Sequence, residues 1–222
     1  MQAKGATGAI LFTGGKDSVY TLHLLKTQIP ISRVKAIIIN PSLPYPNPHA
    51  KNMKVVREIA KLLGIDPVVV GPEKVEEAMV EAARGSEVLA AGDIYLLDHA
   101  RWLESIARKA GVPTVYEPLF NRDTRKLIEE LTGWGLEFTV IGVGSREYRS
   151  LIGMHVTRET LPQFLKEADR LGIDPMGEFA EYHTLVNKVP GHQWRITYKI
   201  TGVREEKGWL YATVTHRIER SV

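Results

Sequence analysis

Residues 9–22, AILFTGGKDSVYTL, contain an apolar run, two adjacent glycines and then the polar residues Lys16, Asp17 and Ser18. The apolar run predicts a β-strand, and the apolar residues after the glycines recur at helical spacing. A strand that leads through a glycine turn into a helix is a common phosphate-binding arrangement, because the first helical turn presents unpaired backbone N–H groups to an anion. The stretch therefore predicts the first strand and helix of an α/β fold, with a phosphate site at the turn.

The first half of the chain repeats this alternation of short apolar runs and helical patterns. Near-continuous apolar strands that alternate with helices indicate a parallel sheet covered on both faces. We therefore expect an α/β fold whose parallel sheet is flanked by helices. The predicted strands are residues 8–13, 34–40, 66–71, 86–92 and 113–118, and the predicted helices are residues 17–28, 49–64, 73–85 and 96–111.

The rest of the chain has a different pattern, in which predicted helices flank a strand at residues 137–144. Residues 193–220 alternate apolar and polar side chains on both sides of the turn sequence REEKG, which predicts a β-hairpin. We expect a boundary near residue 125. It separates a phosphate-binding domain, residues 1–125, from a smaller α+β domain, residues 126–222, that binds substrate and ends in the hairpin.

The composition is that of a globular protein of 222 residues with a formal net charge of +3. Its Lys and Arg residues are spread along the chain, whereas a nucleic-acid surface usually needs a concentrated basic patch, so we expect no nucleic-acid partner. The absence of cysteine excludes disulfides, zinc–thiolate sites and thiol nucleophiles, and favours a cytoplasmic location. No apolar run approaches the ~18 residues of a membrane span, so we expect no membrane partner.

Two well-known phosphate loops do not fit the glycine turn. A Walker A loop requires a glycine where Ile10 stands and a hydroxyl residue where Asp17 stands, and a dinucleotide fingerprint requires separated glycines. The segment T-G-G-K-D-S, residues 13–18, still suits an anion, because Gly14 and Gly15 let the backbone approach closely. Lys16 adds a positive charge, Thr13 and Ser18 add hydroxyl donors, and Asp17 caps the helix or holds Mg²⁺.

Three further candidates follow other predicted strands of the sheet. Asn40 ends one strand, and Gly92 and Asp93 follow another. Ligands of parallel α/β sheets bind outside the carboxyl ends of the strands, so these residues are candidate nucleotide contacts. The Asp93 carboxylate suits either Mg²⁺ or a ribose hydroxyl.

The proline-rich loop NPSLPYPNPHA, residues 40–50, lies over a strand end. It suits a pocket wall or lid and equally an ordinary surface loop. His49 and Asn52 lie beside it in an H-x-x-N pattern and are candidates for contact with the nucleotide.

A second polar cluster lies in the C-terminal part, where Glu178, Glu181, Tyr182, His183 and Thr184 fall within seven residues. If residues 181–186 form a strand, Glu181 and His183 point to one face, and Tyr182 and Thr184 to the other. Two carboxylates and an imidazole suit a cationic substrate, the orientation of ammonia or the acceptance of its proton. The alternative is a strand entry with exposed acids and a hydrogen-bonded histidine.

The segment T-G-G-K-D-S, residues 13–18, resembles the S-G-G-x-D-S pyrophosphate loop of N-type ATP pyrophosphatases, with Thr13 in place of the usual serine. This resemblance implies a HUP-like fold, of the adenine nucleotide alpha hydrolase type, that binds ATP and Mg²⁺. It also implies that a substrate oxygen attacks the α-phosphate, which forms an adenylate and releases pyrophosphate. A nucleophile such as ammonia then displaces AMP.

Four further segments, PHAKN, GDIYLLDHARWLE, EPLF and GEFAEYHTLV, occur in the order found in the diphthine–ammonia ligase family, which the chain resembles. This resemblance implies ATP-dependent amidation of diphthine on translation elongation factor 2 with ammonia. The quaternary ammonium of diphthine suits carboxylates and an aromatic face. The implied catalytic residues are Lys16, Asp17, Glu181 and His183, and Asp17 is also the implied Mg²⁺ ligand. The implied nucleotide-binding residues are Thr13, Gly14, Gly15, Lys16, Asp17, Ser18, Asn40, His49, Asn52, Gly92 and Asp93. The implied diphthine-binding residues are Glu178, Glu181, Tyr182, His183 and Thr184.

The chain departs from the family pattern at three positions. Ala180, preceded by Phe179, stands where the family commonly has glycine before the second glutamate, and Phe120 stands where tryptophan is usual. Alanine adopts a positive φ less readily than glycine, so the Ala180 position bears on the geometry of the second site.

Two other functions remain open from the sequence. One is a tRNA-modifying ATP pyrophosphatase with the same loop, although thiolating members use cysteine or iron–sulfur chemistry and this chain has no cysteine. The other is a non-catalytic adenine-nucleotide-binding protein, which would not need the acids of residues 178–183. The sequence leaves the oligomeric state open, with a homodimer as one option.

Overall fold

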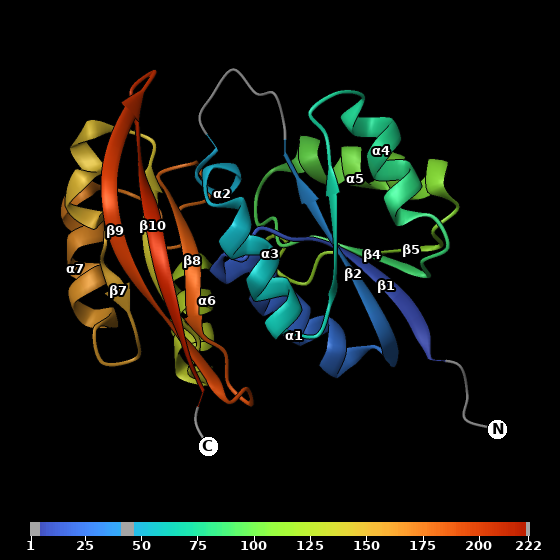
Figure 1. Ribbon diagram of the computed structural model, residues 1–222, viewed down its shortest axis with the longest axis horizontal. Helices are drawn as coiled ribbons and strands as arrows, with labels where there is room; N and C mark the ends of the chain where they lie inside the picture. The colour runs from blue at the N-terminus through green and yellow to red at the C-terminus, as the bar shows by residue number, and fades with distance from the viewer. Residues whose placement is uncertain (1–4, 41–46, 221–222) are drawn as a thin grey trace. The chain divides into compact units, whose positions relative to one another are not determined.

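The computed structural model describes residues 5–40 and 47–220, which form two compact units (Figure 1). The first unit lies within residues 1–13, 17–42 and 57–121, and the second within residues 14–16, 43–56 and 122–222. The last change from the first unit to the second, between residues 121 and 122, lies close to the boundary expected near residue 125. Two earlier segments nevertheless belong to the second unit, and one of them is the middle of the glycine turn. Most of the proline-rich loop, residues 41–46, lies outside the described residues.

The first unit contains a five-stranded parallel sheet with the strand order β3-β2-β1-β4-β5. Figure 1 shows α4 and α5 on one face of this sheet and α1 on the other, which confirms the α/β class. Its elements are β1 (Ala6–Leu11), α1 (Lys16–Gln28), β2 (Ile31–Ile39), β3 (Asp66–Val70), α4 (Val75–Ala83), β4 (Val88–Ala90), α5 (Leu97–Ala110) and β5 (Thr114–Tyr116).

The apolar faces of these elements form the core predicted by their periodicity. On the α4 and α5 side, fully buried residues of the strands, such as Ile37 and Leu89, pack with Met79 of α4 and with Leu103 and Ile106 of α5. Burial of each such side chain stabilises the fold by about 1.5–3 kcal/mol. The core therefore holds the carboxyl ends of the central strands in fixed positions.

The single helix predicted over residues 49–64 is wrong in one respect, because the structure has two helices there, α2 (Pro48–Lys51) and α3 (Met53–Leu62). Asn52 separates them. Its side-chain amide donates to the carbonyls of Pro48, at 2.9 Å, and Ala212, at 3.0 Å, and its Oδ1 accepts from the backbone N–H of Val214 at 3.1 Å. The helix breaks because a buried asparagine bonds to β10 at this point.

The second unit contains a five-stranded antiparallel sheet with the order β10-β9-β8-β6-β7, and β10 also pairs with β6. The pairing of β9 with β10 forms the hairpin that the alternating sequence predicts. The 3₁₀ helix η1 and the short strand β7 had no clear signal in the sequence. The elements are α6 (Thr124–Trp134), β6 (Glu137–Val143), η1 (Arg146–Leu151), β7 (His155–Val156), α7 (Leu161–Leu171), β8 (Tyr182–Lys188), β9 (Trp194–Glu206) and β10 (Trp209–Arg220).

Helix α2 packs directly on this antiparallel sheet. A side chain at Gly142 of β6 would place its Cβ 2.5 Å from Cγ of Pro48, so only glycine fits there. Together with the Asn52 hydrogen bonds, this contact explains why residues 47–56 fold with the second unit. It also brings His49 of α2 to the same sheet as the second polar cluster.

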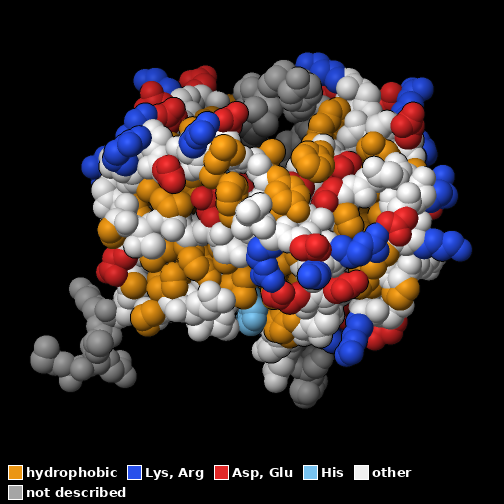
Figure 2. Space-filling view, turned by 180° about the vertical axis from the view of Figure 1, so that it is seen from behind, with side chains coloured by type: hydrophobic (Ala, Val, Ile, Leu, Met, Phe, Trp, Pro, Cys, Tyr) orange, Lys and Arg blue, Asp and Glu red, His pale blue; other side chains and the backbone are white. Residues whose placement is uncertain are grey.

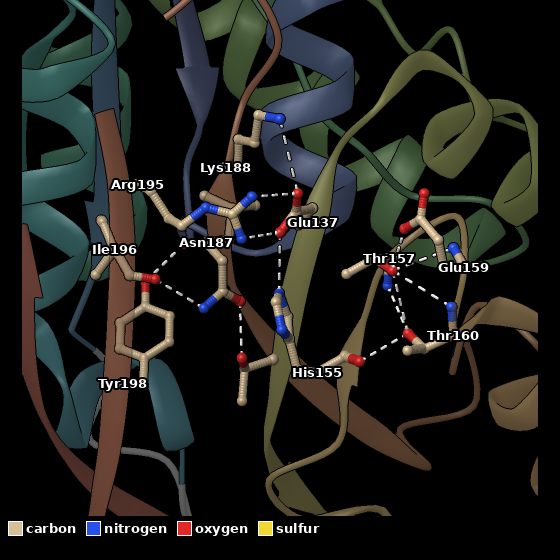
Figure 3. A network of polar contacts seen from close by, with 12 residues as sticks. Glu137, His155, Thr157, Glu159, Thr160, Asn187, Lys188, Arg195, Ile196 and Tyr198 are labelled. Atoms are coloured by element: carbon tan, nitrogen blue, oxygen red, sulfur yellow. Dashed lines mark hydrogen bonds and ion pairs between the residues drawn. The ribbon is translucent and has the colours of Figure 1, made fainter. Parts of the chain in front are cut away.

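A buried carboxylate on β6 contacts side chains from three other strands of the second unit (Figure 3). Glu137 accepts two hydrogen bonds from the Arg195 guanidinium, at 2.6 and 2.8 Å, and its carboxylate lies 3.1 Å from Nε2 of His155 and 3.8 Å from Nζ of Lys188. Lys188 pairs in register with both Glu137 and Arg195, so the row across β6, β8 and β9 holds one carboxylate and two cations. This row favours a single strand register.

We expect Glu137→Gln to lower the free energy of unfolding by about 2 kcal/mol, because it leaves the Arg195 fork without its charged acceptor. Urea denaturation followed by circular dichroism measures the loss. The matched control is Glu219→Gln on β10, whose exposed carboxylate pairs at 3.9 Å with Arg217 and contributes little. Equal stability of the two variants would contradict the structural role of Glu137.

Basic and acidic side chains are interspersed over the face shown in Figure 2. The described residues include exposed ion pairs, such as Arg33 with Asp66 at 3.0 Å, which stabilise the fold by at most about 1 kcal/mol each. Among the described residues, no helix combines the length and the apolar character needed to cross a membrane.

Candidate functional site

The glycine turn connects β1 to α1 and is closed by its own polar side chains. The backbone N–H of Thr13 donates to Oγ of Ser18 at 3.3 Å, and the two hydroxyl oxygens lie 3.2 Å apart. Gly14 has a φ of +70°, which is accessible to glycine and strained for other residues. Helix α1 begins at Lys16, so its N-terminal end, which favours an anion, adjoins the turn.

The middle of the turn, Gly14 to Lys16, is bound to strand β8 of the second unit. The backbone N–H of Val186 donates to the Gly14 carbonyl at 3.0 Å, and the backbone N–H of Lys16 donates to Oγ1 of Thr184 at 3.1 Å. Thr184 was assigned from the sequence to the second site and Lys16 to the first. The structure brings the two residues into direct contact.

The side chain of Lys16 is buried, with only 2% of its surface exposed. Its ammonium donates to the carbonyl of Met176 at 2.7 Å and lies 4.7 Å from the centroid of the Tyr182 ring, a cation–π contact. Tyr182 in turn donates from its hydroxyl to the Pro175 carbonyl at 2.5 Å. Lys16 is therefore oriented by residues of the second polar cluster.

In the first unit, the segment after β4 lies against the first turn of α1. A Cβ at Gly92 would lie 3.0 Å from the carbonyl of Asp17 and 2.9 Å from Oγ1 of Thr21, so this close approach requires glycine. Oδ2 of Asp93 lies 2.8 Å from Nδ1 of His99. Gly92 and Asp93 thus lie beside the start of α1, as the strand-end argument predicts.

The remaining two groups of predicted nucleotide contacts belong to different units. Asn40 ends β2 in the first unit, and its backbone N–H donates to the Val70 carbonyl at 2.8 Å. His49 and Asn52 belong to the second unit, where Asn52 is 4% exposed and forms the three hydrogen bonds described above. These bonds give Asn52 a structural role, and a nucleotide role for these residues remains a prediction.

The turn at residues 174–181 is held together by two carboxylates. Glu181 accepts from the backbone N–H groups of Asp174, at 3.1 Å, and Phe179, at 2.8 Å. The Asp174 carboxylate accepts from the N–H of Met176 at 2.8 Å and from the hydroxyl of Thr124 at 2.7 Å. Asp174 was missed in the sequence, although the turn sequence D-P-M-G was the available signal.

The backbone of this turn adopts left-handed conformations at two positions. Gly177 has a φ of +71°, and a Cβ there would lie 2.6 Å from the Tyr182 ring. Ala180 has a φ of +65°, at the position where the family commonly has glycine. The departure at Ala180 therefore keeps the glycine-like conformation, at a cost of roughly 1 kcal/mol for the alanine side chain.

The predicted sharing of one strand face by Glu181 and His183 is not what the structure shows. Strand β8 begins at Tyr182, and the Glu181 carboxylate turns back to the amides of the preceding turn. The His183 ring instead contacts the rings of His49, at a centroid distance of 5.3 Å, and Trp209, at 5.6 Å. Trp209 was not predicted, because its contact depends on the pairing of β10 with β6.

Burial, and to a lesser extent the nearby charge of Lys16, lower the pKa of His183 to about 4. The imidazole is therefore neutral at pH 7. A neutral ring of this kind serves as a hydrogen-bonding or packing group and is a weak proton acceptor.

We expect the stability of the protein to fall as the pH drops from about 6.5 to about 4. In this window the unfolded chain takes up a proton at His183 that the folded chain does not, which costs at most about 3 kcal/mol and less where water reaches the ring. Urea denaturation at a series of pH values measures this dependence. In the variant His183→Gln the free energy of unfolding should depend less on pH in this range. If the pH dependence of this variant equalled that of the unmodified protein, the buried neutral state of His183 would be contradicted.

The fold and the turn define the class. A parallel sheet whose first strand leads through T-G-G-K-D-S into a helix is an α/β protein, and phosphate binding at the carboxyl end of that strand remains a prediction. Two family models match consecutive parts of the chain, the diphthamide synthase N-terminal domain over residues 6–114 and the diphthamide synthase C-terminal domain over residues 123–222. The chain belongs to the diphthamide synthase family. This membership supports an ATP-using enzyme of the pyrophosphatase type.

Two solved structures are among those to which the chain is similar. One is a U34-tRNA thiolase, NcsA, from Methanococcus maripaludis with its [4Fe-4S] cluster, at 17% identity and a TM-score of 0.38, over 59% of this chain and 58% of the thiolase. The other is a predicted subunit of tRNA methyltransferase from Methanocaldococcus jannaschii, at 18% identity and a TM-score of 0.44, over 82% of this chain and 98% of that protein. No curated protein matches the chain. The chain thus spans little more than half of the thiolase.

Proposed function

We propose that this protein amidates diphthine on translation elongation factor 2, using ATP and ammonia and releasing AMP and pyrophosphate. The observation that carries the proposal is the match to both diphthamide synthase domains in consecutive order. The intact T-G-G-K-D-S turn supports the pyrophosphatase chemistry, and the location is then the cytoplasm, where the factor acts.

In the first step, a carboxylate oxygen of diphthine attacks the α-phosphorus of ATP, and pyrophosphate leaves with the bridging oxygen. Backbone N–H groups at the start of α1 and the Lys16 ammonium stabilise the charge on the leaving group. The described residues contain no group of three or more His, Asp or Glu side chains that could hold a metal. A single carboxylate suits Mg²⁺ bound mainly by phosphates, so Asp17 is the proposed protein ligand.

In the second step, ammonia attacks the carbonyl carbon of the adenylate and AMP leaves. The quaternary ammonium of diphthine needs a carboxylate or an aromatic face. One face of the Tyr182 ring already contacts Lys16, whereas the neighbouring Phe179 has 67% of its surface exposed. We therefore assign recognition of the trimethylammonium group to Phe179 together with Glu178, which lie in the same turn.

The test mixes the protein with ATP, Mg²⁺, an ammonium salt and elongation factor that carries diphthine. We expect AMP and pyrophosphate in equal amounts and diphthamide on the factor by mass spectrometry. ADP as the main product would overturn the proposal. AMP formation only with a tRNA substrate would favour the tRNA-modifying alternative, and ATP binding without turnover would favour the nucleotide-binding alternative.

A further inference from the structure

The C-terminal β-hairpin carries a formal charge equal to the net charge of the whole chain. Residues 194–220 hold six of the 29 Lys and Arg residues and three of the 26 Asp and Glu residues, which gives the hairpin a formal net charge of +3. The formal net charge of the chain is also +3, so the other residues hold 23 charged side chains of each sign. The even spread of Lys and Arg along the sequence therefore conceals a local excess of positive charge on one hairpin.

One face of this hairpin is exposed. Along β9 and β10 exposed residues alternate with residues such as Ile196 and Val214, whose side chains are 0% and 8% exposed. Residues that pair across two antiparallel strands point to the same face. The exposed face, which we call the hairpin face, is formed by Thr197, Lys199 and Arg204 of β9 and by Thr213, Thr215 and Arg217 of β10.

The acidic residues of the hairpin already have cationic partners. The pairs, with their N–O distances, are Glu205 with Arg146 at 2.7 Å, Glu206 with Lys51 at 3.6 Å, and Glu219 with Arg217 at 3.9 Å. In contrast, the side chains of Lys199 and Arg204 form no ion pair within the part of the chain that the structure describes. Two exposed cations beside threonine hydroxyls can therefore bind an external anion.

The chemistry and the size of the hairpin face indicate the kind of partner. Ammonium, guanidinium and hydroxyl groups all donate hydrogen bonds, and carboxylates are the matching acceptors on a protein surface. The face has no apolar centre of the kind that stable interfaces have. It is ~25 Å long and ~10 Å wide, which is less than the ~800 Å² that each partner buries in a stable complex. The face therefore suits a transient contact with an acidic surface.

We propose that the hairpin face docks an acidic surface of the protein substrate, the elongation factor of the proposed function. This inference rests on the proposed function and adds a docking surface to it. Complementary charges raise the rate of encounter more than they strengthen the final complex, so the modified product can leave quickly. The three cations of the face are fewer than the ~6–10 phosphate contacts of a dedicated nucleic-acid surface, which favours a protein partner.

The test compares two triple variants that change the net charge by the same amount. In the hairpin variant, the three cations of the hairpin face are replaced, as Lys199→Glu, Arg204→Glu and Arg217→Glu. In the control variant, exposed lysines of α3, α6 and α7 are replaced, as Lys61→Glu, Lys126→Glu and Lys166→Glu. AMP formation gives kcat and KM for the factor at low and high salt. Fluorescence anisotropy of labelled factor, without ATP, measures binding independently of turnover.

We expect the hairpin variant to raise the KM for the factor by about tenfold at low salt, with kcat within about twofold, and to weaken factor binding to the same extent. High salt should reduce this difference to about twofold, because it screens exposed charges over a few ångströms. The control variant should keep its KM within about twofold. Polyglutamate should compete with the factor for the unmodified protein and should not inhibit the hairpin variant.

An unchanged KM in the hairpin variant, or equal increases in both variants, would overturn the inference. Binding of poly(U) RNA that is lost in the hairpin variant, together with an unchanged KM for the factor, would assign the face to a nucleic acid and also overturn it. If the hairpin variant does not fold, Lys199→Gln decides the matter by an increase in KM of about threefold. Absence of AMP formation by the unmodified protein would overturn the proposed function, whereas the anisotropy measurement would still decide the docking.

Discussion

Replacement of Lys16 by alanine should lower the rate of AMP formation by on the order of 10²-fold. In the proposed site the ammonium of Lys16 contacts a phosphate of ATP, and loss of one charge-assisted contact with a phosphate has an effect of this size. Because Lys16 is 2% exposed and oriented by Met176 and Tyr182, it loses little conformational freedom when it binds ATP. Chromatographic measurement of AMP at saturating ATP, and at a series of ATP concentrations, gives both kcat and KM.

The matched control for this variant is Lys26→Ala, on the same helix α1. Its ammonium donates to the Leu63 carbonyl at 3.2 Å and has no place in the proposed site, so AMP formation should stay within about twofold. Asp17→Asn should reduce Mg²⁺-dependent turnover more than it reduces the melting temperature. Unchanged AMP formation in Lys16→Ala and Asp17→Asn would show that the turn is only a structural connection.

Replacement of Glu181 by glutamine should reduce diphthamide formation by roughly 10²-fold or more while the affinity for ATP stays within a few-fold. In the structure both carboxylate oxygens of Glu181 accept backbone N–H groups, from Asp174 and Phe179. A glutamine side chain has only one acceptor oxygen, so its NH₂ group would face the second of these two backbone N–H donors. The turn that presents Phe179 and Glu178 would then shift, and the unfolding free energy should fall by about 1–3 kcal/mol.

Two measurements on one preparation test this expectation, namely ATP titration and quantification of diphthamide by mass spectrometry. Denaturation curves record the accompanying loss of stability. The control is Glu129→Gln, a change of the same chemistry at an exposed position of α6. If Glu181→Gln kept full diphthamide formation and full stability, the turn would have no part in substrate handling.

Much of the fold follows from short-range patterns in the sequence. The apolar runs and glycine turns predicted β1 to β5 and their helices within a few residues, because these elements are formed by neighbours along the chain. The prediction of a single helix over residues 49–64 was wrong at Asn52, because neighbours along the chain do not cause this interruption. The interruption is caused by hydrogen bonds to Ala212 and Val214, residues about 160 positions away.

The sequence by itself determined the α/β class, the glycine turn between β1 and α1 and the polar cluster at residues 178–184, since each depends on residue types at fixed local spacing. Only the tertiary structure decided the partners of those residues. The backbone N–H of Lys16 donates to the hydroxyl of Thr184, which is 168 positions away. The Glu181 carboxylate accepts from the backbone of its own turn and does not share a strand face with His183. Such contacts depend on strand order and register, which long-range packing sets and local periodicity does not encode.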